Sequence, residues 1–127
     1  MEAILKILSV AVGGSLGAVA RYLINISPLA TVFDKFPLPT FLINIIGSFL
    51  IGFLMIVFAD KMVVNENVRM AVIVGFLGAF TTFSTLSIQT LQASPEVAIL
   101  NVAANLTLGL IGVLIGRQAA IFVAGRS

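Results

Sequence analysis

Residues 75–87 read GFLGAFTTFSTLS, a stretch rich in glycine, threonine and serine within an otherwise apolar part of the chain. The whole chain is 60% hydrophobic and only 9% charged, with a mean hydropathy of +1.19, which is far from the composition of soluble domains. We therefore interpret it as an integral membrane protein. Glycines and hydroxyl groups at the depth of the bilayer then need an explanation, because leucine and isoleucine insert more favourably there.

Uncharged runs define the expected helices. Residues 36–59, 70–95 and 97–116 carry no charge, and each run reaches the roughly 20 residues that a spanning helix needs. A further N-terminal helix ends near Arg21, and we expect no cleavable signal there because glycines interrupt its apolar run. The sequence predicts an all-α membrane protein with a single domain, residues 1–127, and four transmembrane helices at about 5–24, 39–59, 69–92 and 96–116.

Several function classes are excluded by composition. The chain has no cysteine and no histidine, which removes disulfides, thiolate metal sites and a neutral-pH imidazole base. Its net charge of +2 is too small to suggest nucleic acid as a partner. The expected loops are too short for a catalytic domain, so we expect no enzyme and place any function inside the helices.

Small and polar residues recur at helical spacing on three of the expected helices. Packing alone is the simpler interpretation for the glycines, since small residues are common where membrane helices meet. For Asn44, Asn101 and Asn105 we favour a functional role, because three amides exceed what interhelical hydrogen bonding requires in so small a chain. The stripes are Ser9, Gly13, Gly17 and Arg21; Thr40, Asn44, Ser48 and Gly52; and Asn101, Asn105, Gly109, Gly112 and Gly116.

The acidic residues avoid the interior of every expected span. A proton-coupled exporter needs a titratable group in the membrane, and cation pathways usually expose carboxylates or carbonyl rings. Here the interior offers amides, hydroxyls and Arg21, donors that suit an anion. Snorkelling of Arg21 from a helix end to the interface is the alternative interpretation of that residue.

The opening stretch predicts a break in the third helix. Gly75, Gly78, Thr81 and Thr82 are poor helix formers, and interrupted backbone at membrane depth is tolerated only where protein or a cavity satisfies it. Freed carbonyls can bind a cation, and freed N–H groups or hydroxyls an anion. A kink that serves packing alone is the alternative.

Three motifs in order along the chain resemble the Fluc (CrcB) family of fluoride channels: GGSLGAVARY at 13–22, TFLINIIGSFLIG at 40–52 and GFLGAFTTFSTLS at 75–87. Length, loop pattern and number of spans match as well. The resemblance implies an antiparallel, dual-topology dimer with two pores. It further implies passive, fluoride-selective export from the cytoplasm through a multi-pass protein of the inner or plasma membrane.

The resemblance also assigns residues. It implies a structural sodium ion at the dimer centre, held by backbone carbonyls of Gly78 and Thr81 from both subunits. The positive ring edge of Phe83, with amide and hydroxyl donors, would replace the strongly held water of fluoride. Core or lipid-facing packing would otherwise be the default for this phenylalanine. The implied pore residues are Asn44, Thr40, Arg21 at the vestibule, Phe83 as the first phenylalanine of the T-T-F-S-T-F box, Ser84 and Thr85.

This chain departs from the family pattern at four positions. Leu86 stands where the second phenylalanine of the box is usual, and leucine offers an anion no ring edge. Gln89 replaces an expected glutamate, Asn105 an aromatic or histidine, and Gly109 a serine of the polar track. These changes predict that one of the two pore ends is altered.

Basic residues are unevenly divided between the two expected sides. The side with both termini carries Lys6, Lys61, Arg69, Arg117 and Arg126, and the other side only Arg21 and Lys35, which favours cytoplasmic termini. This bias and Leu86 keep open a heterodimer with a related chain, although we favour the homodimer. Two other functions stay open: a small dual-topology multidrug exporter, which would need a carboxylate in the membrane, and a non-conducting accessory subunit.

Overall fold

The computed structural model describes residues 1–59 and 64–125, and its regular elements in these ranges are all helical. Four stretches are long and apolar enough to cross a membrane, which confirms the predicted all-α chain with four candidate spans. The third stretch, Glu66–Gln92, combines four shorter elements, one of them π-helical. The elements are α1 (Glu2–Asn25), η1 (Pro28–Thr31), α2 (Leu38–Val57), α3 (Glu66–Arg69), the π-helix η2 (Met70–Leu77), α4 (Gly78–Phe80), α5 (Ser84–Gln92) and α6 (Pro95–Ala124).

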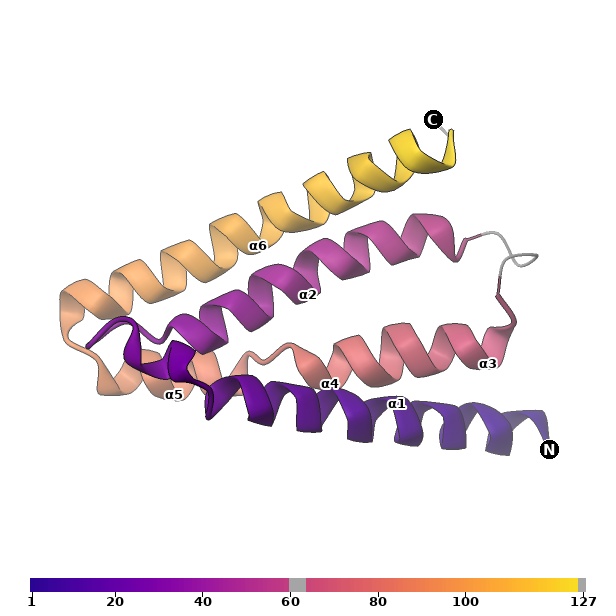
Figure 1. Ribbon diagram of the computed structural model, residues 1–127, viewed down its shortest axis with the longest axis horizontal. Coiled ribbons are helices and arrows are strands. Elements are labelled where there is room, and N and C mark those ends of the chain that lie inside the picture. The colour runs from indigo at the N-terminus through magenta and orange to yellow at the C-terminus, as the bar shows by residue number, and fades with distance from the viewer. Residues whose placement is uncertain (60–63, 126–127) are drawn as a thin grey trace.

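The spans pack as two close helix pairs (Figure 1). One pair is α2 with α6, and the other is α1 with η2 and α4. Glycines permit the close approach: a Cβ at Gly52 of α2 would collide with the Val113 carbonyl of α6, and one at Gly17 of α1 with the Phe76 carbonyl of η2. The packing interpretation is confirmed for these glycines, and Gly13 and Gly116 meet facing backbone in the same way.

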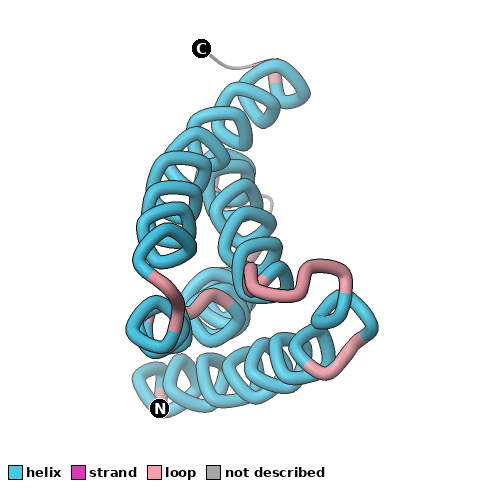
Figure 2. Tube along the Cα trace, turned by 90° about the vertical axis from the view of Figure 1, so that its left-hand side faces the viewer, coloured by secondary structure: helices cyan, strands magenta, loops and turns pink. Residues whose placement is uncertain are grey.

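The ends of the helices fall at two opposite ends of the bundle. The start of α1 and the end of α6 lie at the same end, as four crossings require (Figure 1). The segment with η1 and the turn between α5 and α6 lie at the other end, which faces the viewer in Figure 2. Lys61 and Arg126, which entered the charge comparison, fall outside the described residues.

The observed helix bounds differ from the expected ones mainly in the last helix. α6 continues to Ala124, whereas we expected the fourth span to end at about 116. Arg117 ends the uncharged run there, but a single charge does not stop a helix. α6 stops instead at Gly125, whose left-handed φ of 64° suits glycine at a helix C-terminus. The other bounds lie within three residues of those expected.

Candidate functional site at the interruption of the third span

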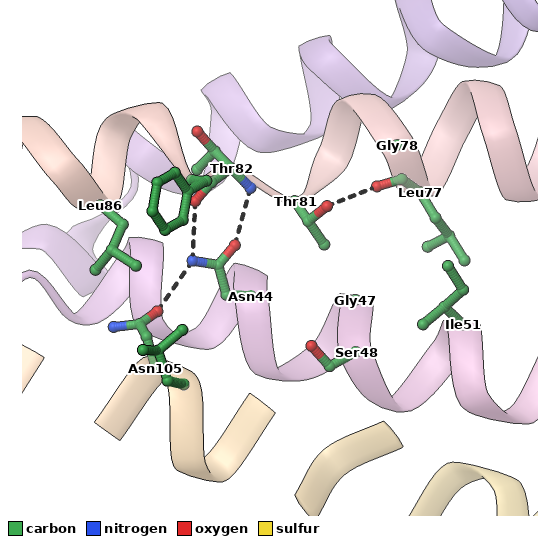
Figure 3. A pocket seen from close by; sticks show the side chains of 12 residues that line it. Asn44, Gly47, Ser48, Ile51, Leu77, Gly78, Thr81, Thr82, Leu86 and Asn105 are labelled. Carbon is green, nitrogen blue, oxygen red and sulfur yellow. Dashed lines mark hydrogen bonds between the residues drawn. The ribbon is translucent and has the colours of Figure 1, made fainter. Parts of the chain in front are cut away.

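The third span is interrupted between α4, which ends at Phe80, and α5, which begins at Ser84. Thr81 has extended backbone there, with ψ of 154°. The Asn44 side chain of α2 clamps the next residue: its Oδ1 accepts from the Thr82 N–H at 2.9 Å, and its Nδ2 donates to the Thr82 carbonyl at 3.1 Å (Figure 3). One amide thus satisfies both backbone groups of the residue in the middle of the interruption.

The Thr82 hydroxyl caps the helix that follows. It accepts from the Thr85 N–H at 3.2 Å and donates to the Thr85 hydroxyl at 3.1 Å, and the residue is only 8% exposed. In a continuous α-helix the Thr82 N–H would bond the Gly78 carbonyl, and the Thr85 N–H the Thr81 carbonyl. Both donors are redirected, so the carbonyls of Gly78 and Thr81 lose their usual helical partners.

Arg21 supports the other side of the interruption. This half-buried side chain near the end of α1 donates from Nε to the Ala79 carbonyl at 3.1 Å, in the last turn before the break. A cation beside the final carbonyls of a helix is electrostatically favourable. Simple snorkelling of Arg21 to the interface therefore does not describe its main contact.

The Asn44 amide begins a hydrogen-bonded series that crosses three helices. Asn44 Nδ2 donates to Asn105 Oδ1 at 2.9 Å, and Asn105 Nδ2 donates to Asn101 Oδ1 at 3.0 Å and to the Asn101 carbonyl at 2.8 Å. Asn101 Nδ2 donates to Thr90 Oγ1 at 3.1 Å, and the Thr90 hydroxyl donates to the Leu86 carbonyl at 2.7 Å. We call Asn44, Asn105, Asn101 and Thr90 the amide chain. All three asparagines of the stripes therefore take part in hydrogen bonding between helices, which we had not expected to require so many amides.

A cavity of about 300 Å³ lies beside the interruption (Figure 3). Its wall is mainly apolar, as at Leu86, and includes polar groups of Asn44, Thr81 and Asn105. Gly47 brings α2 close to the break, because a Cβ there would collide with the Thr81 methyl group. None of the described residues that line this cavity is charged. Its polar chemistry is that of neutral amides, hydroxyls and backbone groups.

The remaining predicted pore residues differ in exposure. Phe83 is 73% exposed on the surface of the chain, whereas Leu86 is only 4% exposed and faces inward. Ser84 is exposed, with its hydroxyl 3.3 Å from that of Thr82. Thr85 is half-buried, and it accepts from the same Thr82 hydroxyl. Both residues nevertheless line the cavity described above, Phe83 with an exposed ring and Leu86 with a buried side chain.

Two buried polar atoms have no hydrogen-bond partner among the described residues, Thr40 Oγ1 and Gln89 Oε1. Thr40 is fully buried in the first turn of α2. Because buried polar atoms are normally paired, each marks unused hydrogen-bonding capacity. The Thr40 hydroxyl can donate a hydrogen bond, whereas the Gln89 oxygen can only accept one.

The sequence did not single out the roles of Thr82 and Thr90. A signal existed for Thr82, because a threonine three residues before Thr85 has the spacing of a helix-capping side chain. For Thr90, which lies at the far end of the amide chain, no local pattern predicted the contact with Asn101.

The family model described as "CrcB-like protein, Camphor Resistance (CrcB)" matches residues 8–117. The chain belongs to the CrcB family. The predicted resemblance is thereby confirmed, and the CrcB chain, with its four apolar helices, is a multi-pass protein of the cell membrane.

Relatives of this CrcB chain carry the name "Fluoride-specific ion channel FluC". One from Methanopyrus kandleri is 42% identical over 96% of this chain and 95% of its own length. One from Magnetococcus marinus is 39% identical over 89% of this chain and 98% of its own length. One from Saccharophagus degradans is 41% identical over 85% of this chain and 84% of its own length. These names describe channels, in agreement with the prediction that the chain is no enzyme.

Proposed function

We propose that this chain is a passive, fluoride-selective ion channel that exports fluoride from the cytoplasm. Family membership and the names of the relatives support the choice of ion. The observation that carries the proposal is the interruption at residues 81–83, which Asn44 clamps beside a cavity without charged lining residues. Such backbone belongs where it lines a cavity or a pathway, not where it faces lipid.

Two hydroxyl donors not used within the chain suit an anion that must exchange water for hydrogen bonds. The Thr40 hydroxyl is buried and unpaired among the described residues, and the Thr85 hydroxyl accepts a bond that leaves its own proton available. Asn44 is different, because both protons of its Nδ2 are directed at protein oxygens. Donation from Asn44 to fluoride therefore requires one of these two bonds to open. The exposed edge of Phe83 supplies a further positive surface.

A structural sodium ion is the second part of the proposal. The chemistry of the donor set fits it, because the carbonyls of Gly78 and Thr81 lose their helical donors to Asn44 and Thr82. Carbonyl oxygens freed at broken membrane helices are suitable ligands for such a cation. Gly78 and Thr81 would hold the ion by main-chain oxygens, and its charge would balance the negative ends of the carbonyl dipoles.

An antiparallel, dual-topology homodimer is the third part. Phe83 and Gly78 are exposed in the single chain, so the proposed pore and cation residues lie where a second copy can complete them. A heterodimer with a related chain is the alternative. The uneven basic residues of the sequence favour it, because a chain that inserts both ways should be balanced.

The two rival functions fit the described residues less well. A proton-coupled multidrug exporter needs a carboxylate within the spans, yet Glu2, Glu66 and Glu96 lie in the first turns of their helices. An accessory subunit would explain the glycine packing, but it leaves the clamp on Thr82 without a purpose.

Efflux from liposomes tests the proposal. The purified chain is reconstituted in vesicles loaded with potassium fluoride or potassium chloride, and valinomycin starts the efflux. We expect fluoride to leave and chloride to stay. Phe83→Ala should abolish the fluoride signal, whereas Phe122→Ala, another exposed ring near the end of α6, serves as the control. Equal rates for both anions, or transport only under a proton gradient, would refute the channel.

A further inference from the structure

The amide chain ties α5 at two points. Its first tie is the clamp of Asn44 on Thr82, just before α5 begins, and its second is the bond from Asn101 to Thr90. These points are eight residues apart, which is about two helical turns. Two ties on a nine-residue helix fix both its position along its axis and its rotation. Phe83 and Ser84 lie between the ties, so the chain sets the direction in which they point.

The bonds of the amide chain also fix one another. Asn101 and Asn105 are 0% and 5% exposed, so water does not readily replace their partners. A half-turn of the Asn101 amide would place its Nδ2 against the donor Nδ2 of Asn105, two donors without an acceptor. The orientation of Asn44 therefore depends on groups as far away as Thr90.

We propose that Asn101 and Thr90 are positioning residues for fluoride conduction, acting through α5 and the Asn44 amide without contacting the ion. This inference rests on the proposed function. It predicts that removing the Thr90 tie lowers both the fluoride flux and the preference for fluoride over chloride. A loss of ordinary packing would not change that preference.

The decisive variant is Thr90→Val, which replaces a hydroxyl by a methyl group of similar size. In the complete chain in liposomes, fluoride flux should fall about threefold to tenfold, the range that one hydrogen bond of ordinary strength represents. Thr90→Ser keeps the hydroxyl and should restore the flux. Thr107→Val removes the same hydroxyl from an exposed position of α6 and should behave as the wild type.

The double variant Thr90→Val with Asn101→Leu removes both partners of the tie. It removes the Asn101 amide that Thr90→Val leaves unpaired, but it also takes away the Oδ1 that accepts from Asn105 Nδ2, so thermal stability should stay below that of the wild type. Flux and selectivity should stay low, because the tie is still absent. Any of three results would overturn the proposal. These are wild-type flux in Thr90→Val, a Thr90→Val protein too unstable to purify, and recovery of flux in the double variant. Absence of fluoride flux in the wild-type chain would instead refute the proposed homodimeric channel.

Discussion

Replacing Asn44 by aspartate tests the clamp at the interruption most directly. The substitution keeps size and shape, and one carboxylate oxygen can still accept from the Thr82 N–H. The second oxygen, however, takes the place of Nδ2 and faces the Thr82 carbonyl and Asn105 Oδ1, now 3.1 and 2.9 Å away. Two hydrogen bonds become two contacts between acceptors.

The expected cost follows from these two contacts. Each buried acceptor left unpaired costs about 1–3 kcal/mol, so the change should destabilise the chain by about 2–6 kcal/mol. That is a large part of the roughly 5–15 kcal/mol by which folded domains are stable. The like-charge effect on a passing anion acts in addition, so fluoride flux should fall by more than tenfold even in protein that folds.

Thermal unfolding of the purified chain measures the first effect, and fluoride efflux from liposomes the second. Ser15→Ala is the control, because Ser15 is exposed on α1 and its hydroxyl bonds the Ala11 carbonyl one turn earlier. It should change both readouts little. An Asn44→Asp protein that melts and conducts like the wild type would refute the clamp as the element that holds the interruption.

Three further changes have expected outcomes. Gly116→Ala forces a Cβ against facing backbone, so it should cost about 1–3 kcal/mol of stability and lower the melting temperature. Gly109→Ala meets only a serine hydroxyl at 3.5 Å, so its melting temperature should equal that of the wild type. Leu86→Phe should raise fluoride flux up to roughly tenfold with chloride still excluded, if the second ring edge contributes; unchanged flux in efflux assays would show that one ring suffices. Thr81→Ser should be mild, because only its carbonyl is proposed to bind sodium. The Cβ added by Gly78→Val has room within the chain, so circular dichroism should stay helical, but crosslinking should detect less dimer. Equal behaviour of Thr81→Ser and Gly78→Val would contradict the carbonyl site.

The sequence predicted the spans well because charge is expensive in lipid. Runs without charge marked three of the four helices, and the predicted ends fell close to the observed ones wherever a proline or a polar loop followed. The exception is α6, whose end depends on Gly125 and not on the charge of Arg117. The π-helical stretch of η2 was not predicted, since no pattern in its apolar sequence distinguishes it from an α-helix.

The candidate site was only partly predictable. The family resemblance assigned Asn44 to a pore, and Gly78 and Thr81 to a separate cation site, whereas the structure has all three lining one cavity. The partners of Asn44 could not be predicted, because they lie 38 and 61 residues away and depend on how three helices are rotated. The contact of Arg21 with the Ala79 carbonyl spans 58 residues and was missed for the same reason.

The amide chain has a consequence for the conditions under which the protein works. Fluoride enters cells as its uncharged acid, so the need for export is greatest when the surroundings are acidic. Amides and hydroxyls neither gain nor lose protons between about pH 5 and pH 8, the interval in which histidine would change its charge. The bonds that join Asn44, Asn105, Asn101 and Thr90 therefore keep the same donors and acceptors throughout this interval. The proposed route would therefore need no protonation step to become active during acid stress.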